Sequence, residues 1–106
     1  MKREEFICNA MKEMADFFLK KENYLFFNDW RYTIDFFKIM ILKLYEYYDS
    51  YALVIKDDRV LNTLKEMLED IDKIYCAGHG LSDEILKKSI REFFRKFSEV
   101  FPNLWD

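Results

Sequence analysis

The scarcity of turn-forming residues most constrains what this chain can fold into. It has two glycines and one proline among 106 residues. A β-sandwich or β-barrel needs turn signals roughly every 8–12 positions, and glycine and proline provide the strongest of these. The chain cannot supply so many turns, whereas helices need few such residues. The sequence therefore predicts an all-α fold.

The composition shows that the chain can build a core. Hydrophobic residues make up 51% of it and charged residues 35%, which excludes a mostly disordered protein. At this length about two thirds of the surface of the unfolded chain can be buried, enough for a core without disulfide bonds. No linker, repeat or low-complexity segment interrupts the sequence. We expect one helical-bundle domain over residues 1–106.

Apolar residues recur at spacings of three and four along most of the chain, which is typical of amphipathic helices. The pattern predicts an antiparallel bundle of four helices, at about residues 2–22, 29–49, 58–77 and 83–101. Residues 50–56 include a short apolar run with no second strand to pair with, so we expect either a continuation of the second helix or a short extra helix there. Residues that favour helix ends stand near these limits: Asp29, Asp57 or Asp58, Gly78 and Ser82.

Residues that commonly build catalytic or metal sites are few. His79 is the only histidine, and no serine or cysteine stands directly beside it to form a nucleophile–base pair. A zinc site needs about four cysteine or histidine ligands, and phosphate-binding loops need more glycine. We therefore expect a protein that is not an enzyme, with no catalytic residue, no cofactor and no bound metal.

The two cysteines, Cys8 and Cys76, stand beside apolar residues in helical patterns. We expect both to be reduced and buried. The sequence shows no apolar export signal after Met1 and no apolar stretch near the roughly 20 residues that a membrane helix needs. These observations predict a cytoplasmic protein that does not enter a membrane.

The charge is unevenly placed along the chain. The formal net charge is −3, whereas nucleic-acid binders usually carry a basic balance. Acidic residues concentrate in the third predicted helix, and basic residues in the fourth. Within the fourth helix, Glu84 with Lys88 and Glu92 with Lys96 have the spacing of stabilising ion pairs.

Tyrosines cluster at the end of the second predicted helix, where one face cannot bury them all. Tyrosine is a frequent anchor of protein interfaces, and acidic residues nearby would steer a cationic partner. The sequence predicts a partner-binding surface with these residues: Tyr47, Tyr48, Asp49, Tyr51, Asp57, Asp58, Glu66, Glu69 and Asp70.

The first functional hypothesis is a small acidic inhibitor of a basic partner protein. Short, acidic, helical and aromatic chains without catalytic chemistry include immunity proteins and antitoxins that neutralise toxins or nuclease domains. This chain shares that profile, although it contains no family motif.

Two alternatives remain open from the sequence alone. One is a nucleic-acid-binding regulator that uses the basic face of the fourth helix, with Lys87, Lys88, Arg91 and Arg95. The other is a homodimer or larger homo-oligomer, in which the second helix buries another apolar face against a copy of itself.

Overall fold

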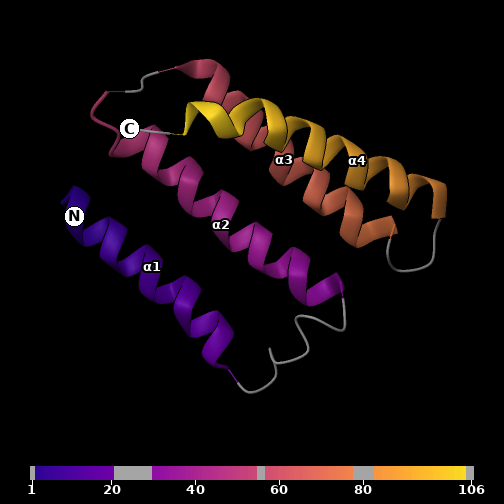
Figure 1. Ribbon diagram of the computed structural model, residues 1–106, viewed down its shortest axis with the longest axis horizontal. Coiled ribbons are helices and arrows are strands. Elements are labelled where there is room, and N and C mark those ends of the chain that lie inside the picture. Colours follow the sequence, from indigo (N-terminus) through magenta and orange to yellow (C-terminus); the bar gives the residue numbers. More distant parts are fainter. Residues whose placement is uncertain (1, 21–29, 55–56, 78–82, 105–106) are drawn as a thin grey trace. The chain divides into compact units, whose positions relative to one another are not determined.

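The computed structural model describes residues 2–20, 30–54, 57–77 and 83–104. Four α-helices account for most of them: α1 (Arg3–Leu19), α2 (Trp30–Ser50), α3 (Asp58–Cys76) and α4 (Asp83–Val100), followed by a 3₁₀ turn, η3 (Phe101–Asn103) (Figure 1). The predicted all-α, four-helix fold is confirmed. The chain divides into two compact units, residues 1–52 and 53–106, and each is a helical hairpin.

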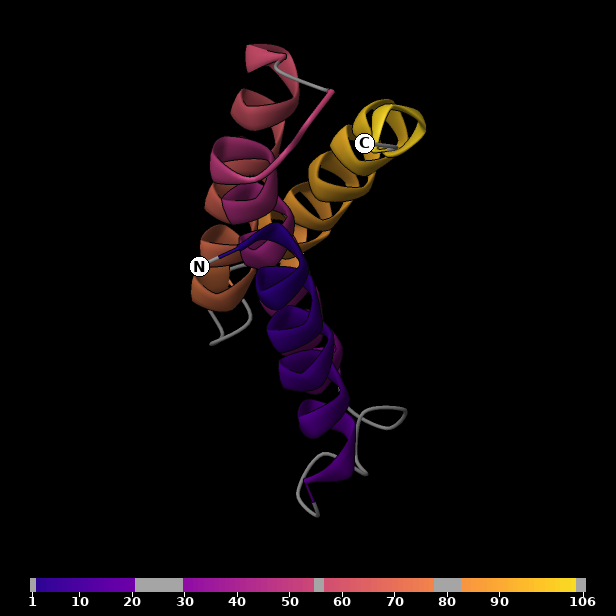
Figure 2. The same ribbon diagram turned by 90° about the vertical axis from the view of Figure 1, so that its left-hand side faces the viewer.

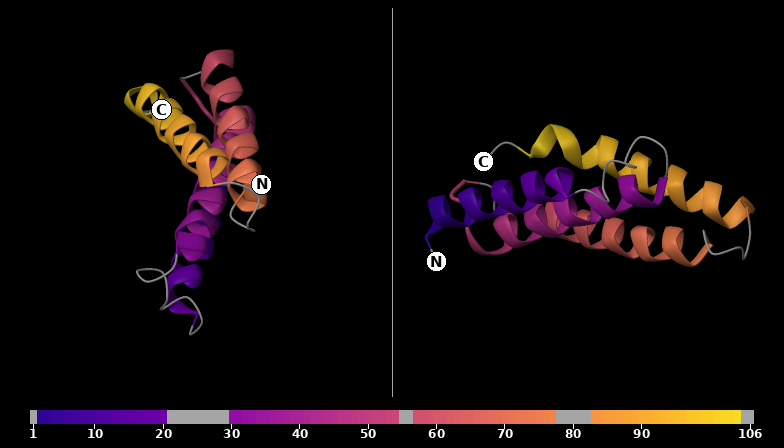
Figure 3. Two further views of the ribbon diagram at one scale, coloured as in Figure 1. Left: turned by 90° about the vertical axis from the view of Figure 1, so that its right-hand side faces the viewer. Right: turned by 90° about the horizontal axis from the view of Figure 1, so that it is seen from below.

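The first unit is the α1–α2 hairpin, in which the two helices run antiparallel (Figure 3). Three apolar residues of α1 that recur at helical spacing, Phe6, Ala10 and Phe17, are buried. At one end of the hairpin the ring of Phe6 stacks on Tyr51, with 4.6 Å between centroids. Towards the other end Phe17 packs against Phe36, with 5.8 Å between centroids. Ring contacts therefore join α1 to α2 towards both of its ends.

The second unit is the α3–α4 hairpin, whose interior is built from apolar residues that recur at helical spacing. Leu64, Met67 and Ile71 of α3 and Phe93 of α4 have no exposed surface. The two helices lie close together near the connection between them and separate towards the start of α3 and the end of α4 (Figure 2).

Local hydrogen bonds explain two helix ends. Asp57 caps α3, because its carboxylate accepts a hydrogen bond from the Arg59 backbone N–H at 2.8 Å, as predicted for this position. At the end of α2, the backbone N–H groups of Tyr51 and Ala52 both donate to the carbonyl of Tyr47, at 2.8 and 2.9 Å. The helix therefore stops there, and residues 51–54 are not helical.

Two predictions at specific positions are wrong. The extra helix proposed for residues 50–56 does not form over 51–54, and residues 55–56 lie outside the described part. Cys8 and Cys76 are free but exposed rather than buried. Each follows a buried residue by two positions, Phe6 and Ile74 respectively, which turns the cysteine about 200° around the helix and away from the core. The predicted end residues Asp29, Gly78 and Ser82, and His79, lie outside the described residues.

Candidate functional site

Two of the tyrosines near the end of α2, Tyr47 and Tyr51, contact α1. The Arg3 side chain donates from Nε to the Tyr47 hydroxyl at 3.0 Å, and Tyr51 stacks on Phe6. Tyr47 and Tyr51 remain half-buried, whereas Tyr48 is 5% exposed. Tyr47 and Tyr51 therefore keep some surface that a partner can reach, and Tyr48 keeps almost none.

Asp49 is exposed and lies in the last turn of α2. That turn contains no basic residue, so the carboxylate adds to the negative end of the helix macrodipole. This placement is unfavourable for the isolated helix. A cation brought by a partner would relieve it.

Three acidic residues of α3 project into solvent. Asp58, Glu66 and Glu69 are exposed, and within the described ranges none of them forms an ion pair. Asp57 differs, because its carboxylate accepts hydrogen bonds from the Arg59 side chain and backbone. The side-chain hydrogen bond, followed by the backbone one, lowers the pKa of Asp57.

Asp70 belongs to the core of the α3–α4 hairpin. It is 3% exposed, and the Lys96 ammonium of α4 binds its carboxylate at 2.7 Å. Lys96 therefore reaches across to α3 instead of pairing with Glu92 as predicted, and Glu92 pairs with Arg95. The sequence contained a signal for the burial of Asp70, because Asp70 falls on the line of Met67, Ile71 and Ile74 that faces the core.

The basic side of α4 is largely neutralised within the helix. Arg95 binds both Glu92 and Glu99, at 2.9 and 2.8 Å, and its hydrogen bond lowers the pKa of Glu92. Lys87 lies 3.7 Å from Asp83. Of the four basic residues proposed for nucleic-acid binding, only Lys88 and Arg91 lack an ion pair in the described part. This weakens the nucleic-acid alternative.

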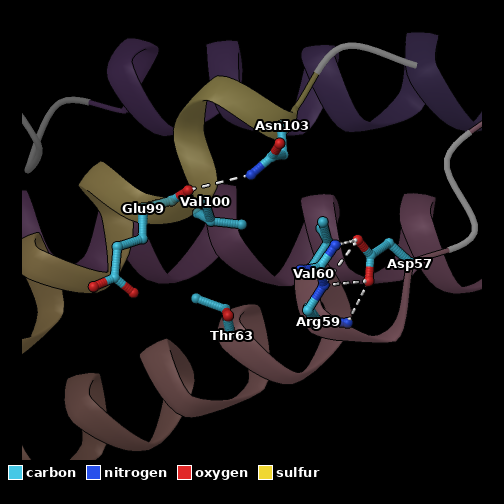
Figure 4. Close-up of a pocket in the computed structure, with 7 residues that line it drawn as sticks. All are labelled: Asp57, Arg59, Val60, Thr63, Glu99, Val100 and Asn103. Carbon is cyan, nitrogen blue, oxygen red and sulfur yellow. Dashed lines mark hydrogen bonds and ion pairs between the residues drawn. The ribbon is translucent and has the colours of Figure 1, made fainter.

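A polar cavity of about 460 Å³ lies between the separated ends of α3 and α4 (Figure 4). The Arg59 guanidinium on its wall is bound to Asp57, and the Asn103 amide donates to the Glu99 carbonyl at 3.3 Å. Among the described residues that line it, Thr63 contributes the only hydroxyl, and no histidine or cysteine accompanies it. The arrangement provides no nucleophile with an adjacent base.

The prediction of the site missed an apolar groove in the α1–α2 hairpin. It has a volume of about 150 Å³ and lies between Ile7, Met11 and Met14 on α1 and residues of α2 that include Met40 and Leu44. Lys43 lines the groove, but Glu13 binds its ammonium at 2.8 Å, and this hydrogen bond raises the pKa of Lys43. The available sequence signal for this groove was the presence of Ile7 and Met11, which extend the apolar face of α1 beyond its buried residues.

Among the described residues, no three potential metal ligands come together. None of the described helices combines the length and apolar character needed to cross a membrane. No protein-family model, curated protein or solved structure matches this chain.

Proposed function

We propose that this chain is a non-enzymatic protein-binding module that occupies and inhibits a basic partner protein, in the manner of an immunity protein or antitoxin. One observation carries the proposal. Asp49, Asp58, Glu66 and Glu69 are exposed without an ion pair in the described part of the chain, whereas Asp57, Glu92 and Glu99 are held by arginines. Such carboxylates attract and orient a cationic partner during encounter.

We assign the contact with the partner to fewer residues than the sequence suggested. Tyr47 and Tyr51 supply partly exposed rings that can anchor a partner, while Tyr48 and Asp70 are buried and are left out of the proposed contact. Asp57 is engaged with Arg59 and contributes chiefly by fixing the start of α3. Tyr47, Asp49 and Tyr51 belong to the first unit, and Asp58, Glu66 and Glu69 belong to the second.

The test begins with capture of the products of neighbouring genes by the full chain. The association rate of any basic partner is then measured against salt concentration. Glu66→Lys/Glu69→Lys should slow association about tenfold or more at low salt and flatten the salt dependence, because the attraction is electrostatic.

A matched control makes the same change in net charge elsewhere. Asp16→Lys/Glu84→Lys reverses two exposed carboxylates on α1 and α4 and should slow association much less. Equal slowing by the two double variants would show that only net charge matters. No slowing by either would refute electrostatic steering.

A further inference from the structure

Helix α1 carries a second exposed face that is apolar beyond Glu4, in addition to the face buried against α2. Cys8, Met11 and Ala15 are all exposed, and Met11 exposes 63% of its surface. Their spacing of three and four residues matches the seam along which two helices of a coiled coil meet. We refer to these three residues as the α1 seam.

One edge of the α1 seam is apolar and indented. Ile7 and Met14 flank the seam, and with Met11 they form the α1 wall of the groove whose α2 wall includes Met40 and Leu44. Among the described residues that line this groove, Lys43 has the only ammonium, and it is bound to Glu13. A helix laid along the seam could therefore place an apolar side chain in the groove without facing an unpaired charge.

The other edge of the seam carries two opposite charges, Glu5 and Lys12. Both side chains are exposed, and neither forms an ion pair within the described part of the chain. They stand seven positions apart, about two helical turns, and so lie on the same edge. A second α1 in antiparallel orientation would bring each Glu5 opposite the other copy's Lys12. A parallel copy would instead place this charged edge against the apolar edge of Ile7 and Met14, because parallel helices pair opposite edges.

We propose that α1 is a dimerisation surface, and that its occupant is α1 of a second copy of this chain in antiparallel orientation. The charged edge of Glu5 and Lys12 is self-complementary, as a two-fold contact requires, and antiparallel packing also opposes the two helix dipoles. The midpoint between Glu5 and Lys12 places the two-fold axis beside Cys8. The proposal is independent of the acidic surface assigned to the inhibited partner.

Sedimentation equilibrium of the full chain up to about 1 mM tests the dimer, because a short helical seam gives a weak contact. Met11→Lys should raise the dimer dissociation constant about tenfold or more. Ile85→Lys is the matched control, since Ile85 is a similarly exposed apolar residue, 55% exposed, on α4. A monomer at every concentration, or equal weakening by both variants, would overturn the proposal.

The two exposed cysteines provide a second measurement, in which the main variant, Cys76→Ser, leaves the seam unchanged. In Cys76→Ser, Cys8 is the only thiol, and a short bis-maleimide should link two chains through it. In Cys8→Ser, the equally exposed Cys76 remains and should give little cross-linked dimer. Equal cross-linking of the two proteins would place the contact elsewhere.

A charge swap tests the orientation. Glu5→Lys and Lys12→Glu should each weaken the dimer, because each places like charges opposite one another. Glu5→Lys/Lys12→Glu should restore it, because the reciprocal pairs are re-formed with opposite signs. Failure of the double variant to recover would rule out the antiparallel pairing.

Discussion

Asp70 is a buried carboxylate whose charge is balanced by one side chain, Lys96. Their side chains are 4% and 14% exposed. Asp70→Asn removes the negative charge and leaves the ammonium desolvated, so we expect a loss of about 3 kcal/mol in the free energy of unfolding, measured with urea. Asp72→Asn, an exposed change of the same kind on α3, should cost no more than about 0.5 kcal/mol.

Replacing both members of this pair tests whether the charge itself stabilises the hairpin. Asp70→Leu/Lys96→Met should lie close to the wild type, because apolar packing commonly substitutes for a buried ion pair. If this double variant is as unstable as Asp70→Asn, the pair has a role that packing cannot replace. If Asp70→Asn is as stable as its control, the burial of the pair has no energetic consequence.

Asp57 links the stability of α3 to pH. Its pKa is lowered by the side-chain hydrogen bond from Arg59 and then by the backbone hydrogen bond. A carboxyl whose pKa is lower in the folded state stabilises above its unfolded pKa, and this contribution is lost as pH falls through the folded value. Stability should therefore decline below about pH 4.

Asp57→Asn is the informative variant, because asparagine also caps helices but does not ionise. Its melting temperature should fall less steeply between about pH 5 and 2 than that of the wild type. Parallel profiles for the two proteins would contradict the assignment. Other carboxyls, including Glu92, keep some pH dependence in both, because the pKa of Glu92 is lowered by Arg95.

At the scale of single elements, the end contact between α1 and α2 depends on Phe6. Its ring is 7% exposed and stacks on Tyr51. Phe6→Ala should destabilise the α1–α2 hairpin by about 3 kcal/mol, through lost burial and the cavity that remains. Met11→Ala, on an exposed face of the same helix, should cost less than about 1 kcal/mol. Thermal unfolding followed by far-UV circular dichroism measures both, and equal losses would contradict the packing.

The sequence predicted the helices better than their ends or their surface contacts. Val60, Leu64, Met67, Ile71 and Ile74 repeat at helical spacing, and all are buried, because one apolar face determines both the helix and its orientation. The end of α1 was placed at residue 22, because no glycine or proline stands near the actual end to mark it. The helix stops at Leu19.

Side-chain pairing was harder to predict, because it depends on which helices face one another. The spacing along α4 favoured an ion pair between Glu92 and Lys96. Lys96 instead pairs with the buried carboxylate of Asp70 on α3. Tyr47 and Tyr51 were expected to be available to a partner, yet Arg3 and Phe6 of α1 cover part of them. Contacts across a hairpin have no signature at short sequence separation.

At the scale of the whole molecule, the two hairpins differ in how completely they bury large side chains. Among the described residues with under 2% exposure, Leu64, Met67, Ile71, Ile74 and Phe93 belong to the α3–α4 hairpin, and Ile41 alone belongs to the α1–α2 hairpin. Helix α1 also exposes Met11 and Leu19. Local opening should therefore require less free energy in the first hairpin.

Native-state hydrogen exchange measures this difference. Amides in the middle of α3 and α4 should exchange at least about tenfold more slowly than those in the middle of α1, since a tenfold ratio needs only about 1.4 kcal/mol. Comparing central residues avoids the fraying of helix ends. Dilution provides the control, because the proposed α1 dimer would protect α1 at high concentration, so the contrast should widen as the protein is diluted. Equal protection in all four helices at every concentration would mean that the two hairpins unfold as one cooperative unit.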